Sequence, residues 1–218
     1  YKNKNYVPEN IVISIAGKLS HNEIISYIKD LNKDWINSEN NNIYEPVQRI
    51  QKKPKINIEY RKTEQSYMIM ALPGLAITDL QKYSLDLISI YLAGGMSSKL
   101  FIDLREKHGL VYDINSYTIN FLDTGALFIS AGSDPSNIVE VIKRISYHLS
   151  ELNNSITEKE LNILKKTLIG RILLSIEDTM ALSYWYGLGE LFLKKSKSPE
   201  EIISHIDNIN ISEINNVT

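Results

Sequence analysis

An arginine and a tyrosine seven positions apart are the residues of this chain whose types and spacing best suit chemistry on a ligand. Arg105 falls in the last turn of a predicted short helix, and Tyr112 lies early in a predicted strand, just beyond Gly109. The chain reversal expected at this glycine can bring a permanently charged guanidinium and a phenol to one rim. A second interpretation stays open, because arginine near a helix C-terminus complements the helix dipole and tyrosine is common in strands.

A glycine-rich turn precedes that helix, with the sequence Gly94-Gly95-Met96-Ser97. It follows a predicted helix, and glycine suits the positive φ values that a tight turn can require. Neither a G-x-G-x-x-G pattern nor a G-K-[S/T] ending is present, which argues against a phosphate-binding loop. Ser97 or Ser98 suits the N-cap of the next helix better than the role of a nucleophile.

The histidines do not form a metal-binding pattern. None of the four histidines has a second ligand at the i+4 spacing of a zinc helix, and the chain contains no cysteine; they are His21, His108, His148 and His205. Helix-borne zinc sites need that spacing or thiolates. We therefore predict no metal site within this chain, and we expect His108 to interact with the exposed carbonyls at a helix end.

Composition narrows the class of protein only a little. The 218 residues carry 24 basic and 26 acidic side chains, for a net charge of −2. This balance gives no electrostatic reason to propose nucleic acid or an anionic membrane as a partner. No apolar run approaches the roughly 20 residues needed to cross a bilayer. We expect a soluble protein, and the compartment stays open, with the cytoplasm slightly favoured.

The first third of the chain combines a strand–helix unit with a polar connection. Residues 10–17 alternate isoleucine with other residues and predict a strand; Ser20 and Glu23 predict a capping box for the helix that follows. Residues 37–54 are polar and contain two prolines, which favours a linker between domains. The chain does not begin with methionine, so we expect it to start inside a longer protein.

The rest of the chain predicts strands first and then helices. Strands are expected at 56–61, 66–72, 110–121 and 125–131, with a Pro73-Gly74 turn after the second. Helical stripes are expected from Leu80 to Tyr91 and from Ile138 to Leu152, and Thr157 with Glu160 predicts a capping box for a third helix. This order indicates an α+β fold.

The segments Leu92–Phe101 and Leu104–Tyr112 together resemble the C-terminal domain of the M16 zinc peptidases (insulinase/pitrilysin, mitochondrial processing peptidase-like). The resemblance extends over nearly the whole chain. It implies an M16-like (LuxS/MPP-like) α+β domain with a mainly antiparallel sheet packed against helices. It also implies three parts: 1–36 as the closing strand and helix of a mostly absent N-terminal domain, 37–54 as the interdomain linker, and 55–218 as the C-terminal domain, truncated at its end.

The same resemblance implies a function for the residues singled out above. Arg105 and Tyr112 match the Arg-x6-Tyr pair that faces the zinc site of these peptidases, where arginine holds the substrate backbone and the phenol stabilises the oxyanion. Gly94, Gly95, Met96 and Ser97 match a glycine-rich segment that lines the peptide path. The implied protein is a zinc metalloendopeptidase that cleaves peptides or unfolded polypeptides. Its zinc ligands belong to the absent N-terminal domain, so this chain alone should be inactive.

A non-catalytic role remains an alternative. M16-like subunits that lack the zinc motif bind peptide or build complexes for a catalytic sibling, and this chain has no His-x-x-Glu-His sequence. The partners implied by the two interpretations are a peptide substrate together with the missing N-terminal domain or a sibling M16 subunit. The residues upstream of Tyr1 would distinguish them. Accidental similarity of an unrelated α+β domain is the third interpretation.

Overall fold

The computed structural model describes residues 2–33, 35, 44–48, 51–153 and 155–218. The chain divides into two compact units. One consists of Tyr1–Pro46 and Gly170–Ile202, and the other of Val47–Ile169 and Ile203–Thr218. We call them the first and the second unit. The chain passes from the second unit to the first within helix α5 (Glu158–Ser175). It returns to the second unit within helix α7 (Pro199–Asn208).

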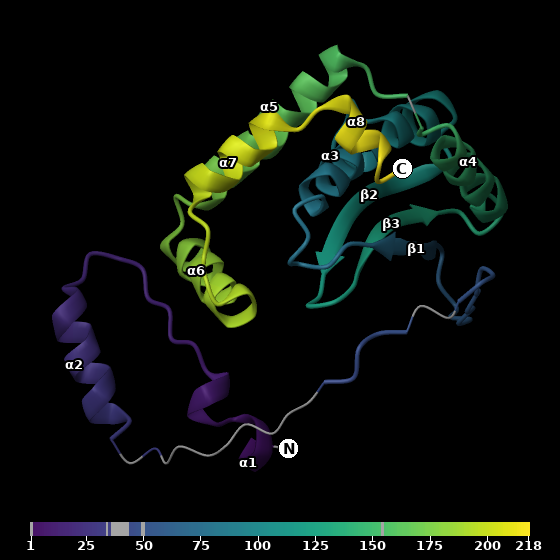
Figure 1. Cartoon of the computed structure of the whole chain (residues 1–218). Helices are drawn as coiled ribbons and strands as arrows, with labels where there is room; N and C mark the ends of the chain where they lie inside the picture. Colours follow the sequence, from purple (N-terminus) through teal and green to yellow (C-terminus); the bar gives the residue numbers. More distant parts are fainter. Residues whose placement is uncertain (1, 34, 36–43, 49–50, 154) are drawn as a thin grey trace. The chain divides into compact units, whose positions relative to one another are not determined.

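The second unit contains an antiparallel sheet of three strands, β1 (Ser66–Gly74), β2 (Val111–Asn120) and β3 (Gly125–Ser133). The strand order is β1-β3-β2, so β3 is central (Figure 1). The predicted Pro73-Gly74 turn is wrong, because both residues continue β1 and pair with Ala126 and Gly125. β1 is an edge strand of this sheet, where proline is tolerated since its missing N–H need not enter a ladder.

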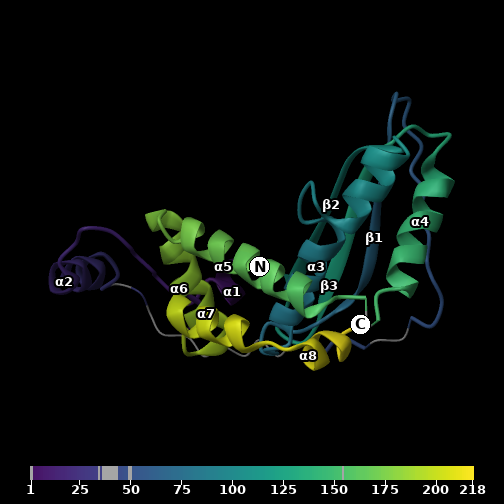
Figure 2. The ribbon, with the colours of Figure 1, turned by 90° about the horizontal axis from the view of Figure 1, so that it is seen from above.

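Helices cover one face of this sheet. They are α3 (Lys82–Ala93), α4 (Ile138–Ser150), the short π-helix η2 (Phe101–Lys107) and α8 (Ile211–Asn215). Figure 2 shows α3 and α4 beside the strands. The core between the layers includes Leu127 and Ile129 of β3 together with Leu87, Ile88 and Leu92 of α3, all of them buried. The predicted α+β fold with a mainly antiparallel sheet packed against helices is confirmed.

The other face of the sheet carries side chains that none of the described helices of the second unit buries. Tyr67 and Ile69 of β1 are exposed on it, and Tyr117 of β2 stacks on Phe128 of β3, with ring centroids 5.1 Å apart. The strict alternation of burial along β1 separates these residues from Met68, which packs toward the core. The sheet is therefore covered by its own unit on one side only.

The first unit is built from helices and extended chain. Its helical elements are α1 (Lys2–Asn5), the 3-10 helix η1 (Pro8–Asn10), α2 (His21–Leu31) and α6 (Thr179–Leu193). In α6, the side chain of Trp185 is half-buried and its indole N–H donates to the Lys197 carbonyl oxygen at 2.9 Å. Its neighbours Tyr184 and Tyr186 are exposed.

Two predicted strands are wrong for the described residues. Residues 11–16 and 56–61 are extended or irregular, but neither segment pairs with a strand that the structure describes. Alternating isoleucines favour an extended chain, whereas a strand also needs a neighbour for its backbone N–H and C=O groups. Much of the predicted linker, 37–54, lies outside the described residues, and its described parts are exposed without helix or strand. The predicted three-part division of the chain stays a prediction.

Of the two predicted capping boxes, the one formed by Thr157 and Glu160 is confirmed and the one formed by Ser20 and Glu23 is wrong. At the start of α5, Thr157 and Glu160 exchange side-chain hydrogen bonds with each other's backbone N–H, at 3.0 and 3.2 Å. Ser20 occupies the N-cap of α2, but its side chain makes no cap hydrogen bond, so the predicted box with Glu23 is wrong. The helix itself forms where the apolar stripe predicts it.

Candidate functional site

Arg105 is presented by the π-helix η2. This helix packs through Leu104, which is fully buried, while Arg105 next to it is exposed. The guanidinium carbon lies 5.2 Å from the centroid of the Phe101 ring, one turn earlier. Arg105 makes no ion pair with any residue that the structure describes. The ring supports the guanidinium from one side and leaves its N–H donors available to a ligand.

Gly109 reverses the chain between η2 and β2. Its φ is +59°, in the left-handed region, and its N–H donates to the Arg105 carbonyl oxygen at 3.1 Å. The Leu110 N–H donates to the Leu104 carbonyl oxygen at 2.7 Å, which satisfies a second carbonyl of the helix end. This confirms the predicted glycine at the helix C-terminus.

A β-bulge turns the Tyr112 side chain outward. Val111 pairs with Ser133 and Asp113 pairs with Gly132, so Tyr112 is an extra residue in β2. Without the bulge, strict alternation from the buried Ile114 would place Tyr112 on the core side. Instead Tyr112 and Asp113 are both exposed, and Tyr112 exposes 53% of its surface.

The two residues predicted to carry the chemistry therefore flank a single turn, and neither is buried as packing. The backbone hydrogen bonds of this turn fix the path between them. Arg105 can supply a permanent positive charge to a ligand, and the Tyr112 hydroxyl can supply a hydrogen-bond donor. That both side chains face one cavity stays a prediction.

The glycine-rich turn differs from the predicted conformation. Gly94 has a φ of −83°, and Gly95 also lacks a positive φ, so the predicted torsional reason for these glycines is wrong. Gly94 is needed for a different reason, because a Cβ there would lie 2.5 Å from the Ile90 Cα atom. A Cβ on Gly95 would meet nothing within 4 Å. Packing does not explain the glycine at position 95.

Ser98 occupies the predicted N-cap position, because the helical residues begin at Lys99 and the Ile102 N–H donates to the Ser98 carbonyl oxygen at 3.0 Å, but its side chain does not cap the helix. The hydroxyl of Ser98, a buried residue, donates to the Gly95 carbonyl oxygen at 2.6 Å, and η2 has no side-chain cap hydrogen bond at its start. Ser97 and Met96 are exposed, and Met96 exposes 79% of its surface. The turn thus exposes Gly95, Met96 and Ser97 to solvent. The hydrogen bond from the Ser98 hydroxyl to the Gly95 carbonyl oxygen stabilises its backbone.

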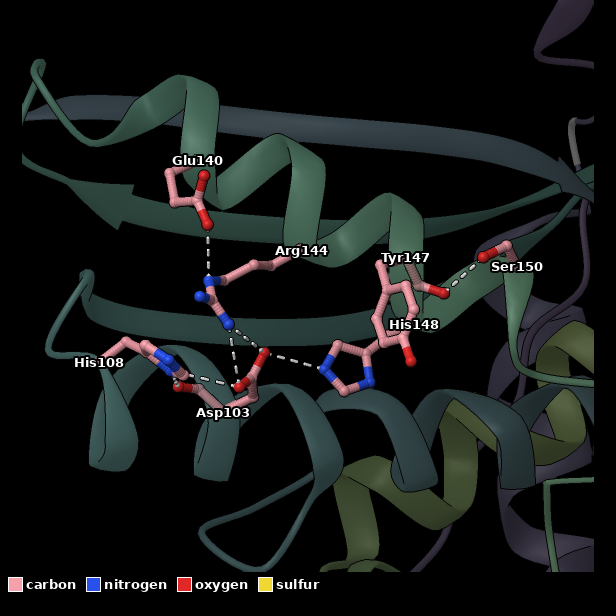
Figure 3. A network of polar contacts seen from close by, with 7 residues as sticks. All are labelled: Asp103, His108, Glu140, Arg144, Tyr147, His148 and Ser150. Atoms are coloured by element: carbon pink, nitrogen blue, oxygen red, sulfur yellow. Dashed lines mark hydrogen bonds and ion pairs between the residues drawn. The ribbon is translucent and has the colours of Figure 1, made fainter.

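A polar network beside η2 was not predicted. Asp103 lies on η2, and its carboxylate is 3.0 Å from His148 Nε2 and 3.3 Å from Arg144 Nη1, both on α4 (Figure 3). Arg144 Nε also donates to Glu140 at 2.9 Å. His108, directly after η2, places its Nδ1 2.8 Å from the Asp103 carbonyl oxygen and 3.3 Å from the carboxylate. The expected role of His108 at the helix end is confirmed.

The charges of this network favour an ionised Asp103. Partial burial of the carboxyl raises its pKa, but the hydrogen bond and charge of His148, with those of Arg144, outweigh this and hold the pKa of Asp103 below its usual value. Carbonyl and carboxylate oxygens only accept hydrogen bonds, so His108 donates from Nδ1 and His148 from Nε2. The sequence offered no signal for this network, because Arg144 and His148 lie 41 and 45 residues from Asp103.

These residues do not fit a zinc ion. Within the part of the chain that the structure describes, no group of three histidine, cysteine, aspartate or glutamate side chains is arranged to hold a metal. The Asp103 carboxylate already binds a guanidinium, a cation that would repel a metal ion. His205 lies elsewhere, with Nε2 3.3 Å from the Leu80 carbonyl oxygen and its ring against Tyr83.

The fold is the mainly antiparallel α+β domain expected for this chain, with Arg105 and Tyr112 exposed near one turn. The model of the peptidase M16 inactive domain matches residues 1–168. The chain therefore belongs to the M16 peptidase family.

Relatives and solved structures agree with this assignment. The chain is 33% identical to the uncharacterized zinc protease YmxG of Bacillus subtilis over 99% of its own length and 52% of the relative's, and 28% identical to the uncharacterized zinc protease SCO5738 of Streptomyces coelicolor over 97% and 47%. It thus spans about half the length of these curated relatives. A conserved protein of Enterococcus faecalis has a TM-score of 0.77 at 25% identity, covering 92% of this chain and 47% of that one. A protease of Helicobacter pylori has a TM-score of 0.78 at 18% identity, covering 93% and 50%, and shows the fold alone.

One further property concerns the described helices. None of them is both long and apolar enough to cross a bilayer.

Proposed function

We propose that this chain is the substrate-binding half of a zinc metalloendopeptidase that cleaves peptides or unfolded polypeptides. The observation that carries the proposal is the bulge in β2, which presents Tyr112 to solvent next to the turn that follows Arg105. Bulges concentrate beside active sites, where they redirect a side chain. The zinc-protease names of the relatives support the reaction class, and the other half of such a protein would hold the metal.

Each candidate residue has a role that its own chemistry supports. The Arg105 guanidinium binds carbonyl or carboxylate oxygens of an extended peptide through its planar fork. The Tyr112 O–H donates a hydrogen bond to the oxygen of the attacked peptide carbonyl, where negative charge develops in the transition state. Gly94, Gly95, Met96 and Ser97 contact the peptide backbone, and the open space around Gly95 permits a close approach.

The alternative is a non-catalytic partner subunit that binds peptide or scaffolds a complex. The observation that favours it is the description of the matching domain as inactive. In that case a sibling M16 subunit would supply the zinc. The zinc content and the peptide cleavage of the full-length protein that includes this chain distinguish the two roles. A partner subunit neither binds zinc nor cleaves peptides.

The Tyr112→Phe variant of the full-length protein tests the catalytic role of the phenol. Loss of one oxyanion donor costs about 100- to 1,000-fold in kcat, with little change in KM, because the phenol acts mainly in the transition state. Tyr184→Phe is the matched control, since Tyr184 is also exposed but lies in the first unit. Equal losses in kcat and in peptide affinity for Tyr112→Phe would contradict the proposed role, as would an effect of the control of the same size.

A further inference from the structure

The network around Asp103 joins the short helix η2 to the longer, firmly packed helix α4. η2 has only seven residues, and π-helices are rare single turns that often occur at functional sites. α4 has thirteen residues, and its Val141 and Ile145 side chains are fully buried in the core. The Asp103 side chain, only 17% exposed, contacts Arg144 and His148 of this anchored helix.

The same carboxylate is connected to the turn that follows η2. His108 donates from Nδ1 to the Asp103 carbonyl oxygen and lies within ion-pair distance of its carboxylate. Gly109 comes next and leads into β2. Asp103 lies two residues before Arg105 and contacts His108, three residues beyond it, as well as α4. These contacts restrain the turn that leads to Tyr112.

We propose that Asp103, with Arg144, His148 and His108, is a positioning group that fixes the separation of Arg105 and Tyr112. This inference rests on the proposed function. Asp103 touches neither residue's functional group through any contact described above, so it acts through the helix and the turn. Because an error of about 1 Å in the placement of a catalytic group can cost about 100-fold in rate, a restraint of this kind matters more for turnover than for folding.

Paired substitutions at His148 in the full-length protein that includes this chain test this inference. His148→Phe keeps a ring but removes the donor to Asp103, whereas His148→Gln retains an N–H that can reach the carboxylate. We expect His148→Phe and Asp103→Asn to lower kcat by about 10- to 100-fold, with KM changed by less than about threefold. His148→Gln should restore most of the loss. His205→Phe is the matched control, because His205 lies outside the network.

The outcomes separate this inference from the proposed function. If Tyr112→Phe lowers kcat while both His148 variants and Asp103→Asn match the unsubstituted protein, the positioning role is overturned and the proposed function stands. If His148→Gln is as impaired as His148→Phe, the hydrogen bond is not what matters, and the positioning role is again overturned. If Tyr112→Phe and Arg105→Ala both leave kcat and KM unchanged, the proposed function fails. Circular dichroism of each variant establishes that it is folded.

Discussion

Replacement of Gly109 by alanine isolates the energetic requirement of the turn between Arg105 and Tyr112. The φ of Gly109 is +59°, and a Cβ built there meets nothing within 4 Å. The substitution therefore introduces no steric clash with the rest of the molecule. Its entire cost comes from holding an alanine in the left-handed region, about 1–2 kcal/mol.

Gly95→Ala is the matched control for this experiment. Its Cβ would also meet nothing within 4 Å, but Gly95 does not have a positive φ. Alanine at such a position is neutral or stabilises by about 0.4–1 kcal/mol through the unfolded state. The two variants differ in the sign of one torsion angle and not in local crowding.

Thermal unfolding of the chain measures the difference. For a protein of about 150–250 residues, about 1 kcal/mol shifts Tm by roughly 2–4 °C, so Gly109→Ala should lower Tm by about 2–8 °C. Gly109→Asn should fall between alanine and glycine, because asparagine tolerates the left-handed region. Equal Tm values for Gly109→Ala and Gly95→Ala, or a loss for Gly109→Asn as large as for Gly109→Ala, would refute the torsional explanation.

Two further predictions concern buried or paired carboxyls. Burial raises the pKa of Asp86, an effect that the Thr118 hydroxyl and Lys82 only partly oppose, so ionisation destabilises the folded state at neutral pH. Asp86→Asn should raise the free energy of unfolding by urea at neutral pH, and the gain should vanish well below the ordinary carboxyl pKa of 3.8; a loss at neutral pH would contradict this. The pKa of Asp103 is lowered, so its contribution to stability is present above the ordinary carboxyl pKa of 3.8 and is lost as pH falls through the lower folded value. Asp103→Asn should therefore destabilise the chain at about pH 6 but much less at about pH 2, and a pH-independent difference would show that ionisation plays no part.

The sequence predicts the elements whose determinants are local. The stripe that defines α4, the capping box of Thr157 and Glu160 and the C-terminal glycine of η2 all depend on residues within a few positions of one another. The segments 11–16 and 56–61 have equally regular alternation, yet they find no partner among the described strands. Strand pairing depends on distant residues, which periodicity does not reveal.

The candidate site divides in the same way. Arg105 and Tyr112 can be selected from their spacing, but the bulge that exposes Tyr112 arises from its register with β3. The contacts of Asp103 with α4 join residues 41 and 45 positions apart. Gly94 illustrates a correct residue with a wrong explanation, because a close approach to Ile90 and not a positive φ requires glycine there.

The extra residue in β2 also separates positions under two kinds of structural constraint. Val111 and Ile114 hold the core, while Tyr112 and Asp113 between them are exposed. Substitutions at these two inner positions can change the exposed surface of the strand without repacking the interior. Deletion of one of them is different, because it would restore strict alternation between the two core residues and leave a single outward side chain. In this strand, a change of residue type alters the exposed surface, whereas a change of length removes one of the two outward positions.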